Sequence, residues 1–359
     1  MAIRFDKDAK RATNGPLIFF SDASSQEAFA EEIRGAIISG LSFYSYRSPS
    51  STMVSFGSSE GFIEGIGEPG FVIGLFDPEK PFITIPYRGV KHQHSSLSLY
   101  TMPQHSTSYE DYSKEVEGII SDLKNVKRGK VVAARVILRN EPLPLAETFY
   151  EFCRKFPEAF IFCFSTPATG CWIGATPELL LESSGTYLNS MALAGTRNAG
   201  SNRPWDEKNM EEQHIVTDYI LNVLKANGLK PFTEETVTKQ TGNIEHICTP
   251  IFADSKSLNA DNLYSLLKSL SPTPALCGSP KNFALTEIQN FEKFQRGCYG
   301  GFCGPYRSLQ DFSLNVVLRC AVVDQLRYCI YSGGGITSVS MVEEEWKETE
   351  MKANNTFGF

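Results

Sequence analysis

The sequence lacks the features by which membrane, secreted and nucleic-acid-binding proteins are commonly recognised. No apolar run approaches the length of about 20 residues that a membrane-spanning helix needs. The 359 residues include 34 basic and 41 acidic side chains, a net charge of −7, so the basic footprint of a nucleic-acid-binding protein is missing. The stretch Met1–Asp8 is charged and has no apolar segment of the kind found in secretory signals. We therefore expect a cytoplasmic protein that binds neither membranes nor nucleic acid.

Paired cysteines are also missing. The nine cysteines are an odd number, and no two are spaced as Cys-x-x-Cys. They lie in apolar surroundings, such as Phe162-Cys163-Phe164. Buried and reduced thiols, typical of a cytoplasmic protein, are the expected state.

Hydrophobic residues make up 42% of the chain, enough for a large core and two lobes. Short strand-like runs mix with amphipathic helical stretches without a regular βαβ alternation, which favours an α+β fold with mainly antiparallel sheets. Residues 1–105 are predicted to form a partial N-terminal lobe and residues 106–359 the main region. Near the C-terminus we expect a long hairpin in which Leu314–Val323 pairs with Leu326–Ser332.

The last acidic stretch carries the first sign of chemistry. A triple glycine, Gly333–Gly335, ends a predicted strand, and the helix that follows contains Glu345 and Glu348. Residues three apart share a helix face, where two carboxylates repel unless a cation lies between them. Oxygen ligands of this kind suit Mg²⁺. An acidic helix start exposed to solvent is the simpler alternative, because the helix dipole favours it.

Nine short motifs follow one another between residues 107 and 359. They are 130–135 (KVVAAR), 174–180 (GATPELL), 193–197 (LAGTR), 245–247 (EHI), 272–278 (PTPALCG), 299–301 (YGG), 317–321 (VLRCA), 333–336 (GGGI) and 345–349 (EWKET). In this order they resemble the chorismate-utilising enzymes: isochorismate and salicylate synthases, and component I of anthranilate and aminodeoxychorismate synthases. The resemblance implies large, mainly antiparallel sheets in a layered core surrounded by helices. The first motif opens with a lysine. In this respect the chain resembles the isochorismate and salicylate synthases, since members that add ammonia generally lack a lysine there.

The resemblance also implies a pair of catalytic residues. Making isochorismate from chorismate requires water to add at C2 and the C4 hydroxyl to leave, so the reaction needs a base and an acid. Lys130 is the implied base that activates water, and Glu178 is the implied acid that protonates the departing hydroxyl. Glu178 would need a raised pKa to hold its proton. Taken without the resemblance, an edge lysine and a solvated turn glutamate are the simpler interpretations.

Metal and substrate contacts follow from the same resemblance. Glu212 and Glu348 are the implied Mg²⁺ ligands, with Glu345 acting directly or through water. The ion would hold the ring carboxylate of chorismate, and Lys352 would help to neutralise that carboxylate or the metal site. The second carboxylate would be held by Arg319, whose paired donors suit it, and by the backbone of Gly333. The other implied substrate contacts are Gly195, Thr196, His246 and Leu276. A structural histidine and a core leucine remain alternatives for the last two.

We predict an Mg²⁺-dependent isochorismate synthase, an isomerase that feeds menaquinone or catecholate siderophore biosynthesis. Chorismate is its predicted small-molecule substrate, and no obligatory protein partner is expected. One alternative is a salicylate synthase, which adds pyruvate elimination to the same first step. Another is component I of anthranilate or aminodeoxychorismate synthase, which needs ammonia and a glutaminase partner; Lys130 argues against it. A catalytically silent chorismate-binding protein is a third.

Overall fold

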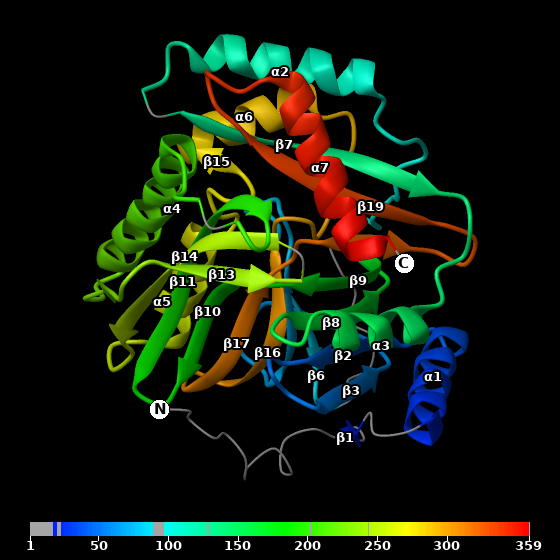
Figure 1. Ribbon diagram of the computed structural model, residues 1–359. Helices are drawn as coiled ribbons and strands as arrows, with labels where there is room; N and C mark the ends of the chain where they lie inside the picture. The colour runs from blue at the N-terminus through cyan, green and yellow to red at the C-terminus, as the bar shows by residue number, and fades with distance from the viewer. Residues whose placement is uncertain are drawn as a thin grey trace.

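The computed structural model describes residues 17–19, 23–88, 97–127, 129–201, 203–242 and 244–358. These residues form seven helices and nineteen strands (Figure 1). The helices are α1 (Ala23–Ile38), α2 (Tyr109–Leu123), α3 (Leu145–Lys155), α4 (Glu207–Ala226), α5 (Ala260–Leu270), α6 (Lys281–Phe291) and α7 (Val342–Phe357). The strands are β1 (Leu17–Phe19), β2 (Ser42–Arg47), β3 (Met53–Ser59), β4 (Ile63–Glu64), β5 (Gly70–Gly74), β6 (Ile83–Pro86), β7 (Lys130–Arg139), β8 (Phe160–Thr166), β9 (Gly170–Thr176), β10 (Leu179–Ser184), β11 (Tyr187–Asn198), β12 (Phe232–Thr233), β13 (Val237–Thr241), β14 (Ile244–Asp254), β15 (Gly278–Ser279), β16 (Phe302–Ser308), β17 (Asp311–Val316), β18 (Cys320–Val323) and β19 (Tyr328–Ile336).

Two large sheets form the centre of the fold. The first has the strand order β1-β3-β2-β8-β9-β18-β19-β7-β15, and the second has the order β12-β14-β11-β10-β17-β16-β5-β6-β4, with β13 also paired to β14. Every described strand pair is antiparallel. The prediction of an α+β fold with large, mainly antiparallel sheets is therefore confirmed.

The N-terminal strands belong to both sheets. Strand β2 pairs with β8, with Tyr44 opposite Phe164, and β5 pairs with β16, with Ile73 opposite Cys303. Strands before residue 105 therefore share hydrogen-bonded sheets with strands after it. The division of the chain at 105/106 stays a prediction.

Two sequence expectations concern membranes and secretion. Among the described residues, none of the helices combines the length and apolarity needed to cross a membrane. Residues 1–8, from which the absence of a secretory signal was predicted, lie outside the described residues.

Strand β8 shows how the first sheet is buried on both faces. Phe160, Phe162 and Phe164 alternate along it with Ile161 and Cys163, and all five are at most 1% exposed. Because successive side chains of a strand point to opposite faces, the three phenylalanines share one face between the sheets. There Phe160 stacks on Tyr46 of β2, Phe164 contacts the Phe71 ring of β5, and Phe162 stacks between its two neighbours. Ile161 and Cys163 pack in a separate core with side chains of α1 and α3. These two helices cover the outer face of that sheet (Figure 1).

One arginine fixes the last helix, α7, on the first sheet. The Arg135 guanidinium on β7 lies over the Trp346 ring, 3.7 Å from its centroid, and Nε donates to Thr349 Oγ1 at 2.7 Å. A cation–π contact and a buried charge-assisted hydrogen bond both restrict how the helix can rotate. These contacts therefore set the direction in which the neighbouring Glu348 and Lys352 point.

The predicted strand Leu314–Val323 is divided in the structure. Strand β17 ends at Val316 in the second sheet, and β18 begins at Cys320 in the first. Arg319, just before β18, has φ +47°, a left-handed value that strand residues do not adopt. The prediction of one strand was wrong because residues 317–318 are apolar and strand-like, whereas the change of sheet is imposed by tertiary packing. The break brings Arg319 to the space between the sheets.

Candidate active site

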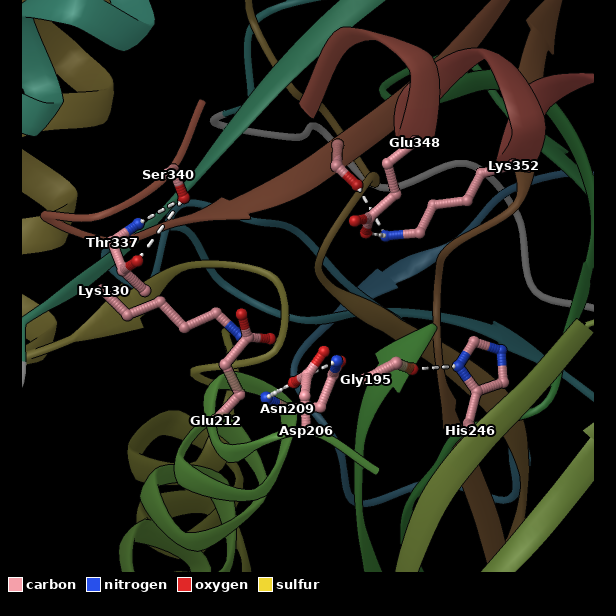
Figure 2. A network of polar contacts seen from close by, with 11 residues as sticks. Lys130, Gly195, Asp206, Asn209, Glu212, His246, Thr337, Ser340, Glu348 and Lys352 are labelled. Atoms are coloured by element: carbon pink, nitrogen blue, oxygen red, sulfur yellow. Dashed lines mark hydrogen bonds and ion pairs between the residues drawn. The ribbon is translucent and has the colours of Figure 1, made fainter. Parts of the chain in front are cut away.

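A cavity of about 240 Å³ is lined by β7 and β19 of the first sheet, by β11 and β14 of the second, and by α4 and α7. Its lining includes eleven of the twelve predicted site residues. They are Lys130, Glu178, Gly195, Thr196, Glu212, His246, Leu276, Arg319, Gly333, Glu348 and Lys352. Side chains from α7 and α4 approach this space from two sides (Figure 2). Residues far apart in the sequence thus meet in one chamber.

Lys130, the first residue of β7, is buried and only 3% exposed. Its side chain crosses the neighbouring strand β19 at Gly335, where an added Cβ would lie 2.5 Å from Lys130 Cε. The missing side chain of this glycine leaves the space that the lysine occupies. At its end, Nζ donates to Glu212 Oε2 at 3.2 Å (Figure 2). A solvated edge lysine, the simpler interpretation of the sequence, is not what the structure contains.

Glu178 follows β9 in the turn that begins at Thr176, and only 3% of it is exposed. Its backbone N–H donates to Thr176 Oγ1 at 3.2 Å, and Thr273 Oγ1 donates to its Oε1 at 3.4 Å. Burial raises the pKa of Glu178 to about 8, although the Thr273 hydrogen bond and the Lys130 charge oppose the shift. The carboxyl group therefore keeps its proton at neutral pH, which a general acid requires.

Glu348 and Lys352 extend from α7 into the same cavity (Figure 2). Lys352 Nζ lies 2.7 Å from Glu348 Oε1 and donates to the Gly333 carbonyl at 3.0 Å. Strand β18 pairs with β19 only as far as Tyr331, so beyond that residue this edge of β19 is open to the lysine. The two carboxylates expected to bind metal, those of Glu212 and Glu348, are thus each paired with a lysine.

Glu345 is the one predicted site residue that does not line this cavity. It is 2% exposed, and its Oε2 would lie 2.9 Å from a Cβ added to Gly334. Cβ atoms added to Gly333 and Gly335 would instead meet Tyr299 and Lys130. Because side chains alternate along a strand, Glu345 lies over the face of β19 opposite to the cavity. The structure therefore does not place this carboxylate with Glu212 and Glu348.

The remaining donors fit a magnesium ion. No group of three or more His, Cys, Asp or Glu residues is preassembled for a metal within the part of the chain that the structure describes. Mg²⁺ does not need one, because it keeps several waters and is held by one or two carboxylates together with substrate oxygens. Glu212 and Glu348, from α4 and α7, supply two carboxylates at one cavity. Glu344, which was not predicted, also lines it.

Gly195 and Thr196 form a bulge in β11. The pairing of β11 with β14 shifts register between Ala194 and Arg197, and Gly195 has φ +64°. A Cβ on Gly195 would lie 2.9 Å from Asn209 Oδ1, so glycine is needed for both conformation and space. Sequence reasoning missed Asn209 and Asp206, which also line the cavity. Their signal was an N-cap pattern, since Asp206 caps α4 by accepting from the Asn209 N–H at 2.8 Å.

Arg319 presents a positive charge to the cavity. Its side chain is buried, and Nη1 has no hydrogen-bond partner among the described residues. Burial lowers the pKa of the guanidinium to about 10, so it is still charged at neutral pH. A buried cation with an unused donor is costly unless an anion binds it. The donor geometry of this group suits a carboxylate.

His246, on β14, lies beside Arg319. Its Nδ1 is 2.7 Å from the Gly195 carbonyl oxygen (Figure 2), and its Nε2 is 2.6 Å from Arg319 Nη2. Burial, followed by the Arg319 charge, lowers the pKa of His246 to about 3. The imidazole is therefore neutral at physiological pH.

The loop before β15 supplies the apolar wall. Leu276 lines the cavity, and its carbonyl oxygen accepts from Arg296 Nη1 at 2.6 Å. Arg296 is buried and pairs with Glu292, which also accepts from the Ala134 N–H at 3.0 Å. Because separating a buried ion pair leaves a charge uncompensated, Arg296 stays beside Glu292. Its hydrogen bond to the Leu276 carbonyl oxygen then holds the loop in place. Tyr299 is a further lining residue, which the sequence marked only as part of a motif.

The sequence is similar to a known protein family and to characterised members of it. Residues 86–357 match the model of a protein family described as "Chorismate binding enzyme". The chain is 31% identical over 218 residues to isochorismate synthase EntC of Escherichia coli (strain K12), which covers 56% of this chain and 55% of EntC. It is 25% identical over 380 residues to isochorismate synthase MenF of Pasteurella multocida, which covers 97% of this chain and 84% of MenF. The match to EntC thus spans about half of that relative's length.

The fold is also similar to a solved structure. MenF of Escherichia coli, described as a menaquinone-specific isochorismate synthase, superposes with a TM-score of 0.75 at 19% sequence identity. The superposition covers 95% of this chain and 92% of that one. At this identity the likeness shows a shared fold.

Proposed function

Since the chain belongs to the family of chorismate binding enzymes, we propose that it is an isochorismate synthase. It would convert chorismate to isochorismate by adding water at C2 and releasing the C4 hydroxyl. The observation that carries the proposal is the meeting of a buried amine, Lys130, and a protonated carboxyl group, Glu178, at one cavity. Arg319 adds a buried cation suited to a carboxylate of the substrate.

Each catalytic side chain has one task in this proposal. Lys130 removes a proton from the attacking water, and Glu178 gives its proton to the departing hydroxyl, so that water rather than hydroxide leaves. Lys130 can accept a proton only as the free amine, and in that form its contact with Glu212 Oε2 is a hydrogen bond rather than an ion pair. Leu276, Tyr299 and Leu318 supply an apolar boundary that limits bulk water around the ring.

We further propose that Glu212 and Glu348 hold Mg²⁺. The ion would neutralise these two carboxylates and attract the ring carboxylate of chorismate. Lys352, which pairs with Glu348 at 2.7 Å, would then be available to the same substrate group. Arg319 and the backbone at Gly333 would hold the second carboxylate.

Product analysis distinguishes the candidate functions. Purified protein incubated with chorismate and Mg²⁺ is expected to form isochorismate, detected by chromatography and mass, without stoichiometric pyruvate. Release of one pyruvate per chorismate would instead identify a salicylate synthase. A product that contains nitrogen and appears only with ammonium would identify the amination branch. Heat-denatured protein is the control for the spontaneous decay of chorismate.

Glu348→Ala tests the proposed metal site. Because it removes one of two carboxylates, the Mg²⁺ concentration for half-maximal activity is expected to rise at least about tenfold. High Mg²⁺ should restore only part of the activity. Glu343→Ala is the matched control, since Glu343 lies on the same helix, is exposed and does not line the cavity. An unchanged Mg²⁺ requirement in Glu348→Ala would remove this residue from the ligand set.

The biological setting is also part of the proposal. We propose a cytoplasmic enzyme that needs no protein partner and supplies isochorismate to menaquinone or catecholate siderophore biosynthesis. Support comes from relatives in both settings: one solved structure is described as a menaquinone-specific isochorismate synthase and another as a putative 2,3-dihydroxybenzoate-specific one. Growth of a deletion strain with either end product would separate the two pathways.

A further inference from the structure

Both ring nitrogens of His246 are engaged by the protein itself. Nδ1 lies 2.7 Å from the Gly195 carbonyl oxygen, and Nε2 lies 2.6 Å from Nη2 of Arg319. A carbonyl oxygen only accepts hydrogen bonds, so Nδ1 must carry the proton. A guanidinium only donates, so Nε2 must present its lone pair. Together the two contacts select one neutral tautomer of the imidazole.

These contacts link the two sheets beside the cavity. Gly195 lies in the bulge of β11 and His246 on the neighbouring strand β14, both in the second sheet. Arg319 immediately precedes β18 of the first sheet. The bulge turns the Gly195 carbonyl toward the histidine (Figure 2), and the histidine in turn reaches the guanidinium.

Arg319 needs neighbouring residues to hold it in place, because its backbone conformation is strained and its charged side chain is buried. Its φ of +47° is a conformation that L-residues rarely adopt and that neighbouring structure must hold in place. The space that Gly174 leaves allows this backbone, since a Cβ there would lie 3.0 Å from the Arg319 carbonyl oxygen. At the other end of the side chain, His246 accepts from Nη2 while Nη1 is left without a partner among the described residues.

We propose that His246 is a positioning residue, which holds the Arg319 guanidinium so that Nη1 meets a carboxylate of the substrate. The inference rests on the proposed function, in which that carboxylate belongs to chorismate, and it gives His246 a role different from contact with the reacting ring. The neutral Nε2 is essential to it, because an imidazolium would present a proton to the guanidinium and repel it.

Two amide variants separate the two hydrogen bonds of His246. In His246→Asn, the shorter side chain can place its NH₂ group near the position of Nδ1, but nothing near Nε2. In His246→Gln, the longer side chain can place its amide oxygen near Nε2 and so still accept from Arg319. The first variant therefore loses the contact to Arg319, and the second keeps it. Each is made in the wild-type and in an Arg319→Met background, and folding is checked by thermal unfolding.

The expected result is a change in KM rather than in kcat. His246→Asn should raise KM for chorismate roughly 10- to 100-fold, because it removes a hydrogen bond to a charged group, with kcat altered less than about threefold. His246→Gln should stay within about threefold of the wild-type KM. In the Arg319→Met background, His246→Asn should cause no further loss of kcat/KM. The proposal would be overturned if His246→Asn left KM unchanged, lowered only kcat, or lost as much kcat/KM in the Arg319→Met background as in the wild type. It would also be overturned if His246→Gln were as poor as His246→Asn.

A second measurement needs no turnover and decides the case even if His246→Asn fails to fold. Imidazole ¹⁵N resonances are recorded from about pH 5 to 9, the range in which an ordinary histidine titrates. One of the five histidines should remain a neutral Nδ1–H tautomer throughout, and its signal should be missing in His246→Gln. If the signal that disappears in His246→Gln titrates in this range, or belongs to the Nε2–H tautomer, the contact is refuted. This measurement needs no turnover, so its failure is distinct from the failure of wild-type protein to convert chorismate.

Discussion

Replacing Lys130 with alanine is expected to reduce the turnover of chorismate by roughly 10²- to 10⁴-fold, the range that loss of a general base produces. The physical reason is that water is a poor nucleophile, and Lys130 is the proposed group that takes its proton. Its amine lines the cavity 3.2 Å from Glu212, where it is protected from solvent. Chorismate and Mg²⁺ binding, measured by calorimetry, should survive, because the proposed carboxylate and metal contacts involve other residues.

Two companion variants make this result interpretable. Lys130→Met keeps most of the side-chain volume, so a similar loss of activity in Ala and Met variants excludes a cavity as the cause. Lys127→Ala makes the same substitution three residues earlier at an exposed lysine and should leave kcat unchanged. If Lys130→Met kept more than about a tenth of wild-type turnover, the lysine could not be the base, since that loss is below the range for general base catalysis.

Local sequence patterns predicted the elements whose boundaries depend on neighbouring residues. The start of helix α2 is of this kind, because the Ser108 side chain accepts from the Asp111 N–H at 3.0 Å, only three residues further along the chain. Capping contacts of this kind can be predicted because hydrogen bonds within a few residues determine them. The roles of Lys130 and Glu178 were instead implied by the resemblance of short motifs to the chorismate-utilising enzymes.

Two features depended on contacts that no local pattern records. The chain changes sheet just before Arg319, although the residues around it are as apolar as those of a continuous strand. Glu345 was placed with Glu348 because they are three residues apart, yet such residues still differ by about 60° around a helix axis. The packing of α7 on β19 then decides that Glu345 meets Gly334 while Glu348 reaches the cavity.

Glu178→Gln is expected to reduce kcat by a similar factor, roughly 10²- to 10⁴-fold, with little change in KM for chorismate. Glutamine has nearly the same shape as a protonated glutamate and can still accept from Thr273, but it has no acidic proton to give to the departing hydroxyl. Glu182→Gln is the matched control on the following strand β10, where the carboxylate accepts from Asn189 at 3.3 Å instead of facing the cavity. That control should retain wild-type activity.

The pH dependence tests the same proton independently. Because burial raises the pKa of Glu178 to about 8, the acid form is present below that value and is lost above it, so wild-type kcat/KM should fall as pH rises through about 8. The residual activity of Glu178→Gln should lack this decline. The same shift means that folding is opposed by the charged carboxylate at alkaline pH, so the glutamine variant is not expected to unfold at a lower temperature there. A decline in kcat/KM that persists in Glu178→Gln would assign the titration to another group and leave the departing hydroxyl without its proposed acid.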